Sequence, residues 1–133
     1  MNDVHVTIKN LYGDLLRSLS ALKQDPSRVQ ASRQVVERAL SDGNTYYGIN
    51  TGFGALARER IDPSQLKKLQ HNLLLSHAVG MGQLIPMDIS RLMLHLKVHA
   101  LGLGYSGISL ETFERLMIFS KLDLIPSVPS RGS

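Results

Sequence analysis

The chain has 133 residues, of which 43% are hydrophobic and 20% charged, a composition typical of one globular domain and not of a disordered segment. It contains no cysteine, which excludes a disulfide framework, a thiolate zinc site and a cysteine nucleophile within these residues. The net charge of +4 comes from dispersed lysines and arginines, and aromatic residues make up only 5%, so we expect no nucleic-acid partner.

The N-terminal third predicts two helices. No apolar run follows a basic patch there, and no later run approaches the roughly 20 apolar residues that span a bilayer, so we expect a cytoplasmic protein with no membrane partner. The first helix is expected over about 11–22, and Gly13 weakens it. The second is expected over about 26–40, because Asp25 and Pro26 form an N-cap and first helical position.

A glycine-rich segment follows, with the sequence YYGINTGFG over residues 46–54. Gly48, Gly52 and Gly54 break any helix and permit positive φ angles, so this segment is predicted to be a shaped loop. Tyr46 and Tyr47 stand at its entrance. From the residues alone, an aromatic side chain packed at the base of the loop is favoured for Tyr47 over a proton carrier.

Three more helices are predicted after the loop. Asp62 and Pro63 open a helix that ends near Gly80 or Gly82. The helix over about 88–101 is apolar almost all round, which indicates a buried helix, and a last helix covers about 110–122. The proline-containing tail cannot continue it. The predicted fold class is therefore all-α, with several packed helices and the loop inserted between them.

Histidines are the remaining candidates for chemistry. His95 and His99 have the i, i+4 spacing of a two-histidine metal site, but residue 96 is leucine and no carboxylate shares that face, so we favour packing and expect no metal. His77 lies near a helix end marked by glycines. The residues alone favour a half-buried histidine with its hydrogen bonds satisfied.

Four ordered motifs carry a resemblance to a known family: YYGINTGFG, NLLLSHAVGMG, LGYSGIS and PSVPSRGS. In order and spacing they resemble the N-terminal part of the aromatic amino-acid ammonia-lyases, and within that family the histidine ammonia-lyases. The resemblance covers nearly the whole chain and is strongest from Tyr46 onward. It implies an N-terminal domain with the tyrosine loop over about 1–108, and the start of a central helical region over about 109–133. It also implies a homotetramer for the complete enzyme.

The resemblance implies an enzyme of histidine catabolism that eliminates ammonia from L-histidine to give urocanate. Its electrophile is a methylidene-imidazolone formed from an internal Ala-Ser-Gly. Tyr47 corresponds to the catalytic acid/base, carried on a mobile loop, and His77, with Ser76 beside it, corresponds to the contact with the substrate imidazole. The loop-shaping residues implied are Gly48, Asn50, Gly52 and Gly54.

Two questions stay open at this point. Ser-His also occurs in some tyrosine aminomutases of the family, so an aminomutase or a lyase for another aromatic amino acid remains an alternative, although NTGFG favours the histidine enzyme. No Ala-Ser-Gly occurs in these 133 residues. We therefore expect the front portion of a longer enzyme, inactive alone and prone to self-association through its apolar helices; a non-catalytic helical interaction module is the other alternative.

Overall fold

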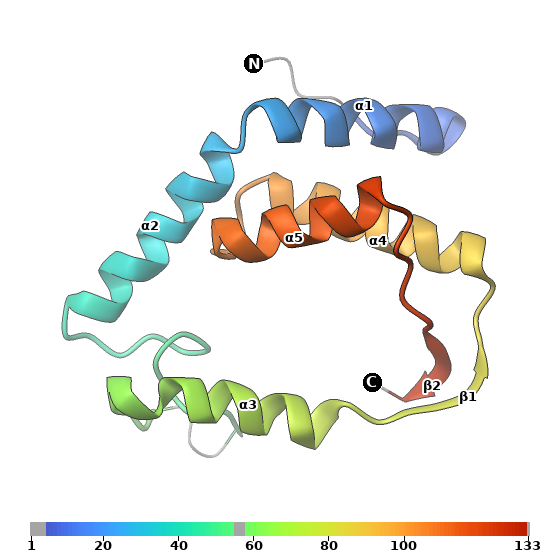
Figure 1. Cartoon of the computed structure of the whole chain (residues 1–133). Coiled ribbons are helices and arrows are strands. Elements are labelled where there is room, and N and C mark those ends of the chain that lie inside the picture. Colours follow the sequence, from blue (N-terminus) through green and yellow to red (C-terminus); the bar gives the residue numbers. More distant parts are fainter. Residues whose placement is uncertain (1–4, 55–57, 133) are drawn as a thin grey trace. The chain divides into compact units, whose positions relative to one another are not determined.

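The computed structural model describes residues 5–54 and 58–132, and the described chain is mainly helical (Figure 1). This confirms the all-α prediction. The helices start and end within about two residues of their predicted bounds, with one exception described below. In chain order the elements are η1 Ile8–Asn10, α1 Leu11–Gln24, α2 Ser27–Ser41, η3 Pro63–Gln65, α3 Leu66–His77, β1 Gly80–Leu84, α4 Met87–Gly102, α5 Leu110–Lys121 and β2 Pro129–Gly132.

Three of the predicted helix starts have side-chain caps. The Asp25 carboxylate accepts the Ser27 N–H at 2.9 Å before α2, and the Asp62 carboxylate accepts the Ser64 N–H at 2.8 Å before η3. The Ser109 hydroxyl accepts the Thr112 N–H at 3.3 Å at the start of α5. Each cap satisfies one of the N–H groups that a helix leaves without an internal partner.

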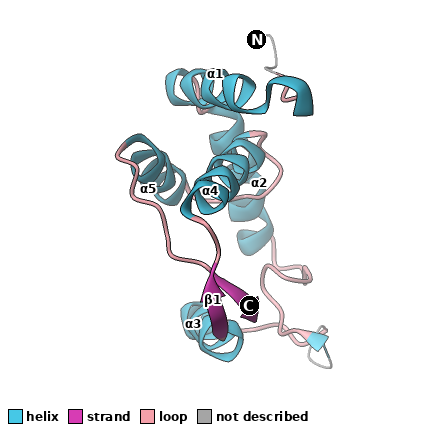
Figure 2. Cartoon of the chain, turned by 90° about the vertical axis from the view of Figure 1, so that its right-hand side faces the viewer, coloured by secondary structure: helices cyan, strands magenta, loops and turns pink. Residues whose placement is uncertain are grey.

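A short two-stranded sheet, β1 with β2, was not predicted (Figure 2). Helix α3 ends at His77, before the glycines expected to end it, because those glycines belong to β1. A Cβ on Gly80 would lie 2.6 Å from the Pro129 ring, and Gly82 has a φ of +85° beside Ser130. The glycines are therefore needed for the close approach of the tail, and not as helix terminators.

The chain divides into two compact units, residues 1–34 with 84–128 and residues 35–83 with 129–133. In the first unit α4 packs against both α1 and α5. A Cβ on Gly102 would collide with Leu22, so glycine permits α1 and α4 to approach closely here. The predicted division near residue 108 stays a prediction. The core of this unit contains Leu19, Val29, Leu94, Val98 and Phe113.

Helix α4 differs from its prediction as a buried helix. Leu94 and Val98 are buried on one side, whereas Ile89, Met93 and Leu96 are 43%, 47% and 38% exposed. The reason is that α1 and α5 cover only part of its circumference in the described chain. Within residues 5–54 and 58–132, no helix is both long and apolar enough to cross a bilayer.

Candidate active site

The predicted site residues all lie in the second unit. There, hydrogen bonds of Asn50 fix the entrance of the tyrosine loop, residues 46–54. The Asn50 side-chain oxygen accepts the Tyr46 N–H at 2.7 Å, and its amide N–H donates to the Asn44 carbonyl at 2.8 Å. The Asn50 backbone N–H also donates to the Tyr46 carbonyl at 3.2 Å. Asn50 is only 2% exposed. A buried amide with both ends hydrogen-bonded fixes the path of the backbone on either side of Tyr47.

Thr51 and the glycines fix the rest of the loop. The fully buried Thr51 hydroxyl accepts the Gly48 N–H at 3.3 Å and donates to the Gly52 carbonyl at 2.8 Å. Gly48 and Gly54 have φ angles of +76° and +59°, which favour glycine. Gly52 differs from these two glycines because its φ angle is not positive. It is buried, and its N–H donates to the Glu59 carbonyl at 3.2 Å.

A second chain segment, residues 59–61, forms backbone contacts with the loop. Thr51 pairs with Arg60 in an antiparallel bridge, and the Ile61 N–H donates to the Asn50 carbonyl at 2.9 Å. The Arg60 guanidinium also donates to the Gly43 carbonyl. The backbone around Tyr47 is therefore held by residues on both sides of the loop.

The two tyrosines have different surroundings. The Tyr46 hydroxyl donates to the Asp42 carboxylate, which raises the pKa of Tyr46 because the carboxylate stabilises the protonated phenol. The same hydrogen bond lowers the pKa of Asp42. Tyr47 is 66% exposed, and its ring meets Phe53 edge-on at a centroid distance of 6.0 Å. The ring contact agrees with the packing interpretation of Tyr47, whereas its exposure leaves the phenol accessible to a substrate.

His77 is the last residue of α3 and is exposed, so the half-buried environment expected from the sequence is wrong. Its Nδ1 lies 3.0 Å from the Leu73 carbonyl oxygen and 2.9 Å from the Ser76 hydroxyl oxygen, and the Ser76 hydroxyl donates to the same carbonyl at 3.0 Å. A carbonyl oxygen can only accept. Nδ1 is therefore the donor in its contact with the Leu73 carbonyl.

The structure brings Ser76 and His77 together at the end of α3 and places Tyr47 on a separate element, against Phe53. Among the described residues, no group of three or more His, Cys, Asp or Glu side chains is arranged to hold a metal. His99 instead has its Nδ1 2.7 Å from the Ser18 hydroxyl.

Sequence reasoning gave no role to Thr51 or Phe53, although both contribute to the geometry of the loop. The available signals were weak. A threonine beside an asparagine in a glycine-rich segment has a side chain suited to bonding nearby backbone groups, and an aromatic residue six positions after a tyrosine can meet it across a turn.

The chain is similar in sequence to known proteins. The family model described as "Aromatic amino acid lyase" matches residues 15–133. The histidine ammonia-lyase of Vibrio cholerae is 46% identical over 120 residues, which are 88% of this chain and 24% of the relative. That of Vibrio vulnificus is 40% identical over 142 aligned positions, covering 100% of this chain and 28% of the relative. The chain thus spans about a quarter of the length of these relatives.

The fold of the chain is also similar to that of solved structures. Histidine ammonia-lyase from Trypanosoma cruzi superposes with a TM-score of 0.70 at 36% identity, over 81% of this chain and 20% of that one. Tyrosine aminomutase from Streptomyces globisporus superposes with a TM-score of 0.74 at 29% identity, over 83% of this chain and 21% of that one.

Proposed function

Because the chain belongs to the aromatic amino acid lyase family, we propose that it is the N-terminal portion of a histidine ammonia-lyase, which eliminates ammonia from L-histidine to give urocanate. The observation that carries the proposal is the accessible Tyr47 phenol on a loop whose backbone is fastened by Asn50 and Thr51. The curated relatives named above are histidine ammonia-lyases, which supports histidine as the substrate.

Tyr47 is proposed to exchange a proton with the substrate through its hydroxyl oxygen. Elimination of ammonia requires removal of a poorly acidic proton next to the carbon that carries the amine, so a base must reach it within hydrogen-bond distance. A fixed loop backbone with an exposed ring meets the positional part of that requirement, and positive φ angles at Gly48 and Gly54 let the chain turn sharply on both sides.

His77 is proposed to recognise the substrate side chain, with Ser76 holding its orientation. In this proposal the His77 Nδ1 contacts the Leu73 carbonyl, and Nε2 accepts the N–H of the substrate imidazole. The Ser76 hydroxyl lies 2.9 Å from Nδ1 and favours this arrangement of the ring.

The methylidene-imidazolone of the family supplies an electrophile toward the substrate. Its Ala-Ser-Gly precursor is not found in these 133 residues, so they do not fit that group and no step through it is assigned to them. We place the electrophile on polypeptide outside this sequence. Cytoplasmic location and assembly into a homotetramer belong to the same proposal.

An aminomutase is the second candidate, because a tyrosine aminomutase shares this fold at a TM-score of 0.74. The two candidates differ in outcome: a lyase releases ammonia, whereas an aminomutase returns an isomeric amino acid.

A chimaera tests the proposal. This chain replaces the matching N-terminal segment of the Vibrio cholerae relative, and urocanate absorbance is followed with histidine, alongside an assay for isomerised tyrosine. Urocanate formation by the folded chimaera is expected, and the 133-residue chain alone should form none. A folded chimaera that isomerises tyrosine and leaves histidine untouched would favour the aminomutase. A folded chimaera without either activity would favour the non-catalytic module.

A further inference from the structure

Strand β2 lies against β1 and against the residue just before it, and glycines permit this close approach (Figure 2). Gly132 has a φ of +84°, and a Cβ on it would collide with the Val79 carbonyl oxygen. A Cβ on Gly80 would lie 2.6 Å from the Pro129 ring. Backbone therefore meets backbone at Gly132, and a side chain at that position would push β2 away from Val79.

Val79 belongs to the turn that ends α3. The Val79 N–H donates to the His77 carbonyl at 2.8 Å, and Ala78 between them has φ and ψ angles of −76° and 73°. These are the features of an inverse γ-turn, in which three residues reverse the chain around one hydrogen bond. A movement of Val79 is therefore transmitted to the backbone of His77 through a single hydrogen bond.

Helix α3 itself gives His77 little support. It has 12 residues, and none of them is buried in the described structure. A helix of this length without a packed face is only marginally stable in water. The segments at its two ends therefore decide where its last turn lies: η3 with the Asp62 cap comes before it, and the contact of β2 with Val79 and β1 comes after it.

We propose that β2 positions the substrate-binding histidine, with Gly132 as the positioning residue. The strand fixes Val79, and through the γ-turn it fixes the direction from which the His77 imidazole meets the substrate. Pro129 adds a second contact to the same pairing, at Gly80. This inference rests on the proposed role of His77 in recognising the substrate side chain; Gly132 acts through Val79 and need not touch the substrate.

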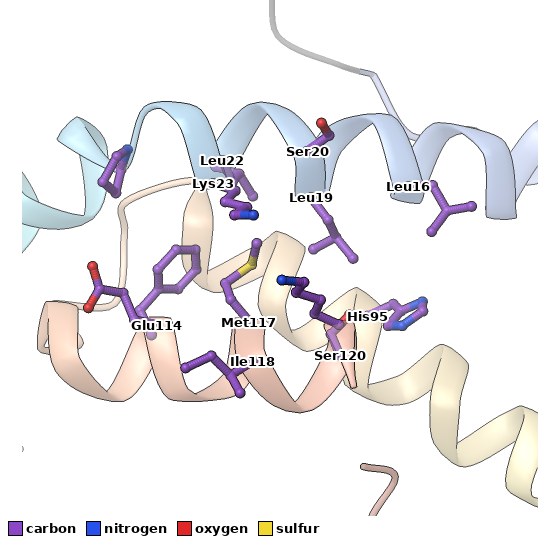
Figure 3. Close-up of a pocket in the computed structure, with 13 residues that line it drawn as sticks. Leu16, Leu19, Ser20, Leu22, Lys23, His95, Glu114, Met117, Ile118 and Ser120 are labelled. Atoms are coloured by element: carbon purple, nitrogen blue, oxygen red, sulfur yellow. The ribbon is translucent and has the colours of Figure 1, made fainter. Parts of the chain in front are cut away.

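Two positions in the first unit supply matched controls. Gly104 has a φ of +81°, and a Cβ on it would lie 2.7 Å from the Arg28 carbonyl oxygen, so Gly104→Ala creates the same kind of collision with backbone. Met117 lines a groove of about 680 Å³ among α1, α4 and α5 (Figure 3). Met117→Ala removes apolar contacts from that unit and should lower its stability. Neither residue belongs to α3, β1 or β2.

The first experiment follows the histidine ring resonances of the 133-residue chain by NMR. Gly132→Ala should shift the His77 resonances and leave those of His71, six residues earlier on α3, nearly unchanged. Gly104→Ala and Met117→Ala should leave the His77 resonances in place, even where they lower the stability of the chain. An unmoved His77 in folded Gly132→Ala, or equal shifts of His77 in the controls, would overturn the proposal.

A pair of variants at the other contact decides the matter if Gly132→Ala does not fold. Gly80→Ala brings a methyl group against the Pro129 ring, and adding Pro129→Ala removes the ring atom nearest to that methyl group. The single variant should shift the His77 resonances, and the double variant should return them toward their original positions. A double variant no closer to the original chain than the single one would refute the coupling through β2.

Kinetics in the chimaera test the consequence for the substrate. Gly132→Ala should raise KM for histidine about tenfold with kcat within a few-fold of its original value, because the imidazole contact is already made in the bound substrate. The inhibition constant of phenylalanine, whose ring has no N–H, should stay within about twofold. Equal weakening of both amino acids would contradict the positioning of His77. An unmodified chimaera without urocanate formation would count against the proposed function, whereas the NMR comparisons still decide this inference.

Discussion

Asn50 and Tyr46 bind each other in both directions: the Asn50 side-chain oxygen accepts the Tyr46 N–H at 2.7 Å, and the Asn50 N–H donates to the Tyr46 carbonyl at 3.2 Å. The side-chain amide N–H of Asn50 donates to the Asn44 carbonyl at 2.8 Å. This reciprocal pair closes the entrance of the loop immediately before Tyr47. The position of the proposed catalytic phenol therefore depends on a buried amide that need not touch the substrate.

The first prediction concerns that amide. Asn50→Ala removes two part-buried hydrogen bonds, to the Tyr46 N–H and the Asn44 carbonyl, and should reduce the free energy of unfolding by about 1–3 kcal/mol. Urea unfolding of the 133-residue chain measures this change in the free energy of unfolding. Asn72→Ala, at an exposed position of α3, is the control and should change stability by less than about 0.5 kcal/mol. Equal effects of the two variants would contradict the role of Asn50 in the loop.

The second prediction separates the two tyrosines in the chimaera. Tyr47→Phe removes an exposed hydroxyl, so kcat should fall at least about a hundredfold with little change in stability. Tyr46→Phe instead removes the hydrogen bond to Asp42, so it should reduce stability slightly and leave kcat within a few-fold of its original value. A normal kcat in Tyr47→Phe would reject the catalytic assignment and favour packing against Phe53.

The third prediction concerns substrate choice. Replacing Ser76-His77 with Phe-Leu in the chimaera removes the acceptor nitrogen proposed for the substrate imidazole, at a cost of about 1–3 kcal/mol for the unpaired group. The ratio of kcat/KM for histidine to that for phenylalanine should fall accordingly. An unchanged ratio would show that specificity resides in the polypeptide outside these 133 residues.

The fourth prediction is a pH dependence at Asp14, which is only 4% exposed. Hydrogen bonds from the Thr7 backbone and hydroxyl, together with Arg17 and Asn10, lower the pKa of Asp14. The folded state thus holds its proton less tightly than the unfolded state, so the stabilisation is complete above about pH 5 and is lost as the pH falls through the usual carboxyl range and below.

Urea unfolding between pH 7 and pH 3 tests this linkage. Asp14→Asn should be less stable at pH 7 and should lose less stability on acidification than the original chain. Glu111→Gln, which removes an exposed carboxylate paired with Arg115, is the control and should follow the original pH profile. Parallel profiles for the original chain and Asp14→Asn would contradict the prediction.

Local signals predicted most of the helices. Asp25, Asp62 and Ser109 cap their own chain segments, and capping is decided within a few residues, so a single sequence suffices. The pairing of β1 with β2 was not predicted because it joins residues about fifty positions apart in the sequence. Nothing near Gly80 indicates that Pro129 will lie against it. Such contacts depend on the fold of the intervening chain.

The candidate site shows the same distinction. The glycines of the loop and the tyrosines could be recognised from their pattern, and the positive φ angles of Gly48 and Gly54 agree with it. The exposure of His77 could not be predicted from the sequence, because burial depends on which elements cover the end of α3. The same reason explains why the apolar composition of α4 overstated its burial: Met93 is 47% exposed despite its apolar neighbours.

The last prediction follows from that exposed side of α4. Ile89, Met93 and Leu96 are spaced at about one helical turn and are 38% to 47% exposed in the described chain, and exposed apolar patches usually mark association surfaces. We expect the 133-residue chain to self-associate through the segment 89–119. Light scattering at increasing concentration should therefore give a mass above the 14.7 kDa of the monomer.

Variants locate the contact. Met93→Glu places a charge in the middle of the α4 stripe and should shift the chain toward the monomer, because an unpaired carboxylate is costly to bury in an apolar contact. Met81→Glu is the matched control: Met81 is 61% exposed but lies on β1, outside the segment, so this variant should associate like the original chain. A monomeric original chain at high concentration would refute self-association, and equal disruption by both variants would place the contact elsewhere.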